Sequence, residues 1–325
     1  MKKILFICTA LPVLLSSCAS LTKSQVEAVH QFAQTSKDFS AYPSEILTAM
    51  AELRVKRGVY YTNSLEDPEE ITASDPNDNT VDIDSLRELA VTAHVKELND
   101  VYKAKKDDYA ASEKANITFK IIDKYAQSLL LLTADKHESD MKAQAANFGG
   151  SLDSLIGKYN GLEGAQKVKP GIGGLIGSLV MAGGKQFIRA KQAKEIQRFI
   201  PAADEMIGVM TGNLLEFLQS GKIAALIANE EKGIQNNYRS FLRHRKPFIQ
   251  NEWDYLDLLH HLDRIKALRD ETIEATKSLR TAHSDILTAI KEKKTLTEAV
   301  AGVQSLYEDV SEIRSTIHEL HTVKN

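Results

Sequence analysis

Two long stretches of this chain contain neither glycine nor proline, and they constrain its fold more than any other feature. They run from Asp84 to Phe148 and from Phe248 to Ala301. An average helix has about 11–12 residues, so stretches several times longer favour long helices over short connected elements. Ala, Leu, Lys and Glu are abundant, and aromatic residues make up only 6% of the chain, which is a composition typical of helices. We therefore expect an all-α protein.

The apolar residues of the second stretch recur every three or four positions, which places one narrow apolar stripe on a helix. This stripe consists of Leu258, Leu262, Ile265, Leu268, Thr272, Ala275, Leu279, Ala282, Ile286 and Ala289. A second stripe consists of Leu296, Val300, Val303, Leu306, Val310, Ile313, Ile317 and Leu320. Between the two, Thr295 and Glu298 have the spacing of a capping box that begins a new helix. The pattern predicts an antiparallel helical hairpin within an elongated bundle of long, coiled-coil-like helices.

The N-terminal half has similar apolar stripes, here called seams, and two segments that interrupt the pattern. Phe32, Phe39, Ile46, Leu53 and Tyr60 lie seven residues apart, with Pro43 expected to kink their helix. A further seam consists of Met141, Ala145, Phe148, Leu152, Leu155 and Tyr159. Residues 62–84 hold eight acidic residues, no basic one and two prolines, which indicates a solvated loop. We expect one domain over 24–325, with this acidic loop and a glycine-rich segment at 149–184.

The N-terminus has the features of an export signal. Lys2 and Lys3 precede an apolar stretch over 4–15 that is too short to span a membrane, and small residues follow it. The sequence Leu-Ser-Ser-Cys at 15–18 resembles the lipobox of bacterial lipoproteins. This resemblance implies that residues 1–17 are removed and that Cys18 is acylated, with fatty acids such as palmitate, at the start of a short linker over 18–23. An ordinary signal peptide with a chance cysteine is the alternative.

Cysteine usage and charge limit what the mature chain can be. The other cysteine, Cys8, lies in the signal, so the mature chain has no disulfide, thiol nucleophile or thiolate metal site. Removing Lys2 and Lys3 from 41 basic residues against 44 acidic ones leaves a net charge of −5, which argues against a nucleic-acid partner. By the same resemblance, Ala19 after Cys18 favours the outer membrane, and the lack of a following acidic run favours its periplasmic face.

The most distinctive feature of the body is an apolar, glycine-rich stretch over 171–184 that precedes a basic helix. Glycines four residues apart permit close helix approach. The candidate residues for membrane or partner contact are Gly173, Gly177, Leu175, Leu179, Lys185, Arg189, Lys191, Lys194 and Arg198. In one interpretation the glycines pack inside the bundle and the cations are solvated. In the other, 171–200 binds or inserts into a bilayer, although the apolar part is too short to span one alone.

The second interpretation has a distant parallel. Long antiparallel helices with one short apolar, glycine-rich element resemble the cytolysin A class of α-helical pore-forming toxins in architecture. That resemblance implies a membrane-active protein as the alternative function.

Other patterns give weaker signals. Asp75, Asn77 and Asn79 alternate as in a calcium loop, but Gly and Glu are missing from the sixth and twelfth positions. Glu27 with His30, and Asp257 with His260, approach di-iron spacing, but the seams predict that both histidines face solvent. A last basic group, namely Arg239, Arg243, His244, Arg245 and Lys246, precedes Pro247 as at a helix end.

Motifs of catalysis and nucleotide binding do not occur in the sequence. We find no nucleophile elbow and no phosphate-binding loop, and the glycines at 171–177 follow no strand. We expect no cofactor or metal and a non-enzymatic, structural or partner-binding role. The expected partners are the membrane, through Cys18, and a protein or a second copy of the chain, through the helices.

Overall fold

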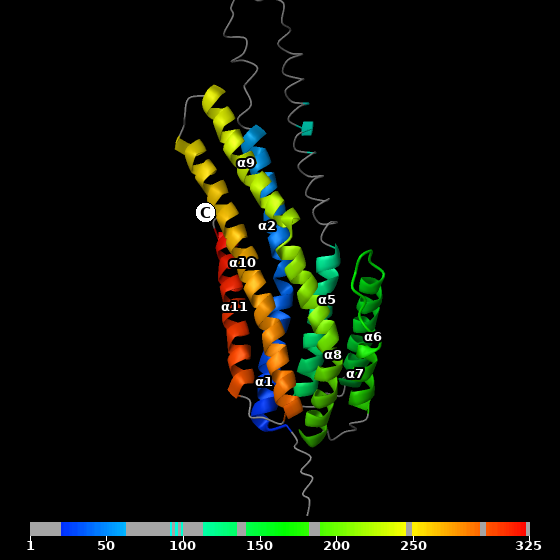
Figure 1. The fold of residues 1–325 in the computed structure, drawn as a ribbon. Coiled ribbons are helices and arrows are strands. Elements are labelled where there is room, and N and C mark those ends of the chain that lie inside the picture. Colours follow the sequence, from blue (N-terminus) through cyan, green and yellow to red (C-terminus); the bar gives the residue numbers. More distant parts are fainter. Residues whose placement is uncertain are drawn as a thin grey trace, which may run out of the picture.

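The computed structural model describes residues 21–62, 113–134, 141–181, 189–244, 249–292 and 297–322, and the single residues 92, 95, 96 and 99. Over these residues all regular structure is helical and no strand occurs. The helices lie side by side along one long axis (Figure 1). The predicted all-α, elongated bundle is confirmed.

The helices differ greatly in length. Their bounds are α1 (Lys23–Ala41), α2 (Pro43–Thr62), α5 (Glu113–Thr133), α6 (Met141–Asn160), α7 (Ile172–Met181), α8 (Arg189–Leu218), α9 (Gly221–His244), α10 (Ile249–Glu292) and α11 (Thr297–Thr322). At 1.5 Å per residue, the 44 residues of α10 extend about 66 Å.

The two ends of the bundle are made of different elements. The basal end, at the bottom of Figure 1, holds the starts of α1, α8 and α11 and the end of α10. The far end, at the top, holds the ends of α2 and α9 and the start of α10. α6 and α7 form a shorter pair along one flank, against α5 and α8. The elements thus run up and down between two separate ends.

The predicted hairpin is present as α10 and α11, which pack along each other. Every position of the α10 stripe is buried. The second stripe was wrong at one described position, because Val300 is 48% exposed and Ala299 is buried in its place. Thr295 and Leu296 lie outside the described residues. Ala299, Val303 and Leu306 are spaced four and three apart, so they share the face of α11 that meets α10.

The N-terminal seam is also confirmed, because Phe32, Phe39, Ile46, Leu53 and Tyr60 are all buried. At Pro43 the chain separates into two helices, with Pro43 as the first residue of α2. A proline is tolerated there because the first N–H groups of a helix have no intrahelical acceptor. The acidic loop over 62–84 and the calcium-like positions 75–79 lie outside the described residues, apart from Thr62 at the end of α2.

Candidate functional site

The first helix begins directly after the predicted lipidation site. Cys18 lies outside the described residues, but Thr22 is already the N-cap of α1. Its backbone N–H donates to the Gln25 side chain at 2.7 Å, and the Gln25 N–H donates to the Thr22 hydroxyl at 3.3 Å. This reciprocal capping box satisfies two N–H groups that the helix leaves unpaired. The predicted linker over 18–23 therefore ends inside an ordered helix start.

The glycines of α6 and α7 bring the two backbones into contact. A Cβ atom on Gly149 would collide with the backbone of Gly173, and a Cβ atom on Gly173 would collide with that of Gly149. The carboxylate of Asp153, on α6, accepts the N–H groups of Gly173 and Gly174, each at 2.9 Å. Asp153 thus caps α7 from a neighbouring helix, and Gly173 permits close helix approach.

The turn between α6 and α7 is fixed by a second side chain. Asn160 donates from Nδ2 to the Val168 carbonyl at 2.8 Å, and its Oδ1 accepts the Val168 N–H at 2.8 Å. Gly171, just before α7, has a φ of +94°, a conformation that L side chains rarely adopt. These contacts position the start of the glycine-rich helix.

The described half of α7 packs inside the bundle. Ile172 and Ile176 are buried, and Leu175 is half-buried against the core. The surroundings of Gly177 and the side chain of Leu179 are not among those described, and Lys185 lies wholly outside the described part of the chain.

The described cations and apolar residues of α8 lie on different faces of the helix. Lys194 and Arg198 are exposed, whereas Ile196 and Phe199 are buried. Arg198 lies 3.7 Å from the Glu195 carboxylate. Arg189 and Lys191 lie in the first turn of α8, but their side chains are not among those described.

The two histidines of di-iron spacing behave differently. His260 is exposed, as predicted. The prediction for His30 was wrong, because its Nδ1 lies 2.9 Å from the Thr133 hydroxyl in the α1–α5 contact. Among the described residues, no group of three or more His, Cys, Asp or Glu side chains could hold a metal ion.

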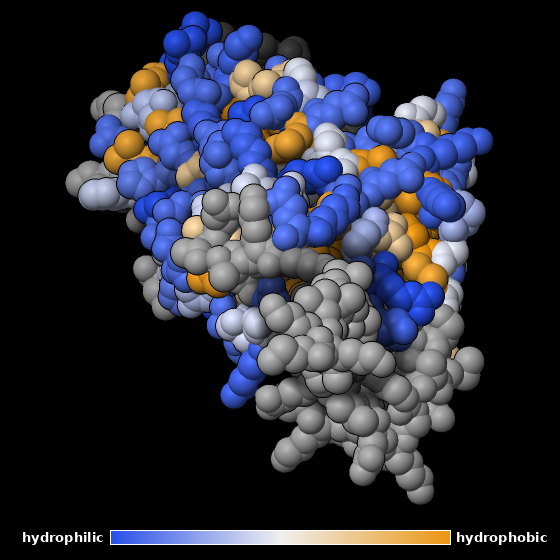
Figure 2. All heavy atoms as spheres, turned by 60° about the horizontal axis from the view of Figure 1, so that its bottom comes forward, coloured by the Kyte–Doolittle hydropathy of each residue, from blue (hydrophilic) through white to orange (hydrophobic). Residues whose placement is uncertain are grey.

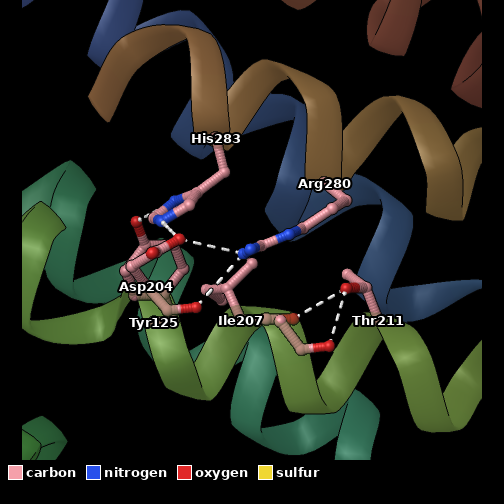
Figure 3. Close-up of polar contacts among 7 residues, drawn as sticks. Tyr125, Asp204, Ile207, Thr211, Arg280 and His283 are labelled. Carbon is pink, nitrogen blue, oxygen red and sulfur yellow. Dashed lines mark hydrogen bonds and ion pairs between the residues drawn. The ribbon is translucent and has the colours of Figure 1, made fainter. Parts of the chain in front are cut away.

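A polar cluster that we did not predict from the sequence joins α5, α8 and α10 (Figure 3); Tyr125 and His283 are buried in it, and Asp204 and Arg280 are partly exposed. His283 on α10 lies 3.0 Å, through Nδ1, from the Tyr125 hydroxyl on α5. Its Nε2 lies 3.5 Å from Asp204 Oδ1 on α8. Arg280, one turn earlier on α10, donates to the same Oδ1 at 2.9 Å and to the Asp204 carbonyl at 3.1 Å. Four side chains thus tie three helices together.

Burial controls the protonation of this cluster. It lowers the pKa of His283 to about 4, against the opposing charge of Asp204 and with a smaller contribution from Arg280. Burial also raises the pKa of Tyr125 well above its ordinary value. His283 is therefore neutral at pH 7. The imidazole of His283 and the phenol of Tyr125 are both buried and contact each other, so the cluster holds packed helices together. Its sequence signal is the run of polar residues Thr272, Thr276 and His283 on the buried side of α10.

At the far end, the surface carries four exposed apolar side chains, Val59, Leu242, Trp253 and Leu256. Beside them, Tyr238 and Tyr255 stack with ring centroids 4.1 Å apart. Below this surface, burial raises the pKa of Tyr60 to about 12.

No protein-family model, curated protein or solved structure matches this chain. Within the described ranges, none of the helices is both long and apolar enough to cross a membrane.

Proposed function

We propose that this chain is an outer-membrane lipoprotein, acylated at Cys18 and facing the periplasm, whose helical bundle is a non-enzymatic scaffold. One observation carries the proposal, namely that α1 begins at Lys23, five residues after Cys18. At about 3.3–3.6 Å per residue, a linker of that length spans only a short distance between the lipidated cysteine and the helix. The lipid would therefore hold the basal end of the bundle against the bilayer.

The length of the helices determines how far from the membrane the scaffold would reach. α10 runs from the basal end to the far end without interruption. An upright bundle would hold its far end about 60 Å from the lipid, at 1.5 Å per residue. Its partner would be a protein, or a second copy of the chain, that packs on the helices.

Acylation is tested by the mass of the mature N-terminus and by fractionation. We expect the membrane fraction to contain a chain that begins at Cys18 and carries acyl groups. The Cys18→Ser variant should move to the soluble envelope fraction. A wild-type chain that is cleaved but soluble would identify an ordinary signal peptide and overturn the proposal.

The upright orientation is tested with the single tryptophan, Trp253, which is 63% exposed at the far end. In proteoliposomes with a short-range energy acceptor on the lipid headgroups, Trp253 should transfer little energy. The matched variant Trp253→Phe/Val300→Trp places the indole at an exposed position near the basal end, where strong transfer is expected. Equal transfer from both positions would mean that the bundle lies flat.

A second candidate is a membrane-active protein that inserts the glycine-rich segment. It is favoured by the fact that α7 is the most apolar of the described helices. Insertion would require α7 to leave Asp153 and expose Ile172 and Ile176. If the unlipidated chain permeabilises liposomes, and charges placed at Leu175–Val180 abolish this, the second candidate replaces the first.

A further inference from the structure

The fold gathers exposed cations at the same end as the predicted lipid anchor. Lys23 opens α1, Lys194 lies near the start of α8, and Lys291 lies in the last turn of α10. These positions are far apart in the sequence, but Figure 1 places the three helix ends together at the base of the bundle. All three side chains are exposed, and none forms an ion pair with a described residue. Each is therefore available to an external anion.

The exposed carboxylates at this end are fewer. Glu27 and Glu292 are exposed there and Asp285 is half-buried, while Glu195 is buried beside Arg198. Arg189 and Lys191, in the first turn of α8, add two positive residues, and Glu298, in the first turn of α11, adds a negative one. Among the exposed described residues at this end, the cations Lys23, Lys194, Arg198 and Lys291 thus outnumber the carboxylates.

The described part of the basal surface is mostly hydrophilic. Figure 2 turns this end forward, and the described residues that it shows are mainly hydrophilic, with groups of apolar residues between them. Exposed cations on such a surface can bind headgroups by charge.

The anchor would bring these cations within range of the headgroups. Thr22 is the fourth residue after Cys18, which is a reach of at most about 14 Å. Electrostatic attraction acts over a Debye length, roughly 8–10 Å at physiological salt. Lys23 is next to Thr22, so a lipidated Cys18 leaves it within or close to that range.

We propose that the basal end, through Lys23, Lys194 and Lys291, is a binding surface for anionic lipid headgroups. This inference rests on the proposed lipidation of Cys18, because the anchor decides which end meets the bilayer. The cations would then hold the bundle upright, while the acyl chains provide attachment.

The test uses the Cys18→Ser chain without residues 1–17, so that binding does not depend on acylation, and none of the described residues is removed. Sedimentation is measured with vesicles of phosphatidylcholine alone and with phosphatidylglycerol added. The basal variant is Lys23→Gln/Lys194→Gln/Lys291→Gln. The matched control, Lys232→Gln/Arg239→Gln/Arg243→Gln, removes three exposed cations of α9, two of them in its far-end turns, so both variants change net charge equally.

We expect binding only to the phosphatidylglycerol vesicles, weakened by added salt. Each lysine near an anionic surface contributes roughly a fivefold factor, so the basal variant should bind on the order of a hundredfold more weakly. The control should bind like the parent chain. Equal losses in both variants, equal binding to neutral vesicles, or no binding by the parent chain would each overturn the inference. A failure of acylation would appear separately, in the mass of the native N-terminus.

Discussion

Nδ1 of His283 lies 3.0 Å from the hydroxyl of Tyr125, and this contact joins α10 to α5 across 158 residues of sequence. The two rings meet edge-on, with centroids 5.8 Å apart. Tyr125 is also stacked on Phe199 of α8 and lies edge-on to Phe32 of α1. One aromatic and polar centre therefore fixes the relative positions of four helices.

Acid should destabilise the protein through His283. Its pKa is about 4 in the folded chain and about 6.5 when unfolded. Because the folded pKa is the lower one, the stability is complete above pH 6.5 and is lost as the pH falls towards 4. At 1.36 kcal/mol per pKa unit, we expect a loss of roughly 2–3 kcal/mol between pH 7 and pH 4.5. Urea unfolding at both values measures it.

The His283→Gln variant should lack this component, while His260→Gln, at an exposed position, should retain it. The comparison is needed because carboxylates also titrate near pH 4. An unchanged pH profile in His283→Gln would contradict the assignment.

The contact between α6 and α7 predicts opposite effects at adjacent glycines. A Cβ atom on Gly149 meets the Gly173 backbone, whereas one on Gly150 meets nothing within 4 Å. Gly150→Ala should therefore stabilise the chain by about 0.5–1 kcal/mol through helix propensity. Gly149→Ala should lower the thermal midpoint, because backbone cannot move aside as a flexible side chain can. Stabilisation by both substitutions would refute the close approach.

Loss of the Asp153 carboxylate should loosen α7 in particular. Asp153→Ala leaves the Gly173 and Gly174 N–H groups without an acceptor, which costs about 1–2 kcal/mol, as for a helix cap. Hydrogen exchange should accelerate at these two amides and stay unchanged in α11. Asp270→Ala, at an exposed position, serves as the control. Uniform acceleration throughout the chain would point to global destabilisation instead.

The ion group between α2 and α9 should depend on the carboxylate of Glu230. Arg54 and Arg57 each donate to Glu230 at 2.8 Å, and Glu230 is 3% exposed. Glu230→Ala leaves two arginines without this partner, and breaking such a pair typically costs about 3–5 kcal/mol. Chemical denaturation measures the loss. Glu231→Ala, the control, removes a half-exposed carboxylate that pairs with Lys266, and it should lower the free energy of unfolding by less than about 1 kcal/mol. A similar loss in both variants would mean that Glu230 does not stabilise the contact between α2 and α9.

Helix periodicity was enough to predict the fold class and the buried residues of most seams. A stripe identifies the buried face but not the partner helix, so the sequence placed Val300 in the core although Ala299 faces α10. His30 was misjudged for the same reason, because the position of Thr133 beside it depends on how α5 packs on α1. The His283 cluster escaped prediction because its four residues come from three helices. The contact between Gly149 and Gly173 likewise could not be predicted without knowing how α7 packs on α6. The spacing of the glycines at 173 and 177 indicated close packing but not the partner helix.

Asp153 holds α7 through main-chain N–H groups, which every residue except proline provides. The attachment therefore places almost no demand on which amino acids follow Gly173. In a comparison of diverged copies of this chain, position 153 and the two contacting glycines should change slowly, while the rest of the α7 start should exchange one apolar residue for another freely. The docking of this helix can thus persist while its sequence drifts.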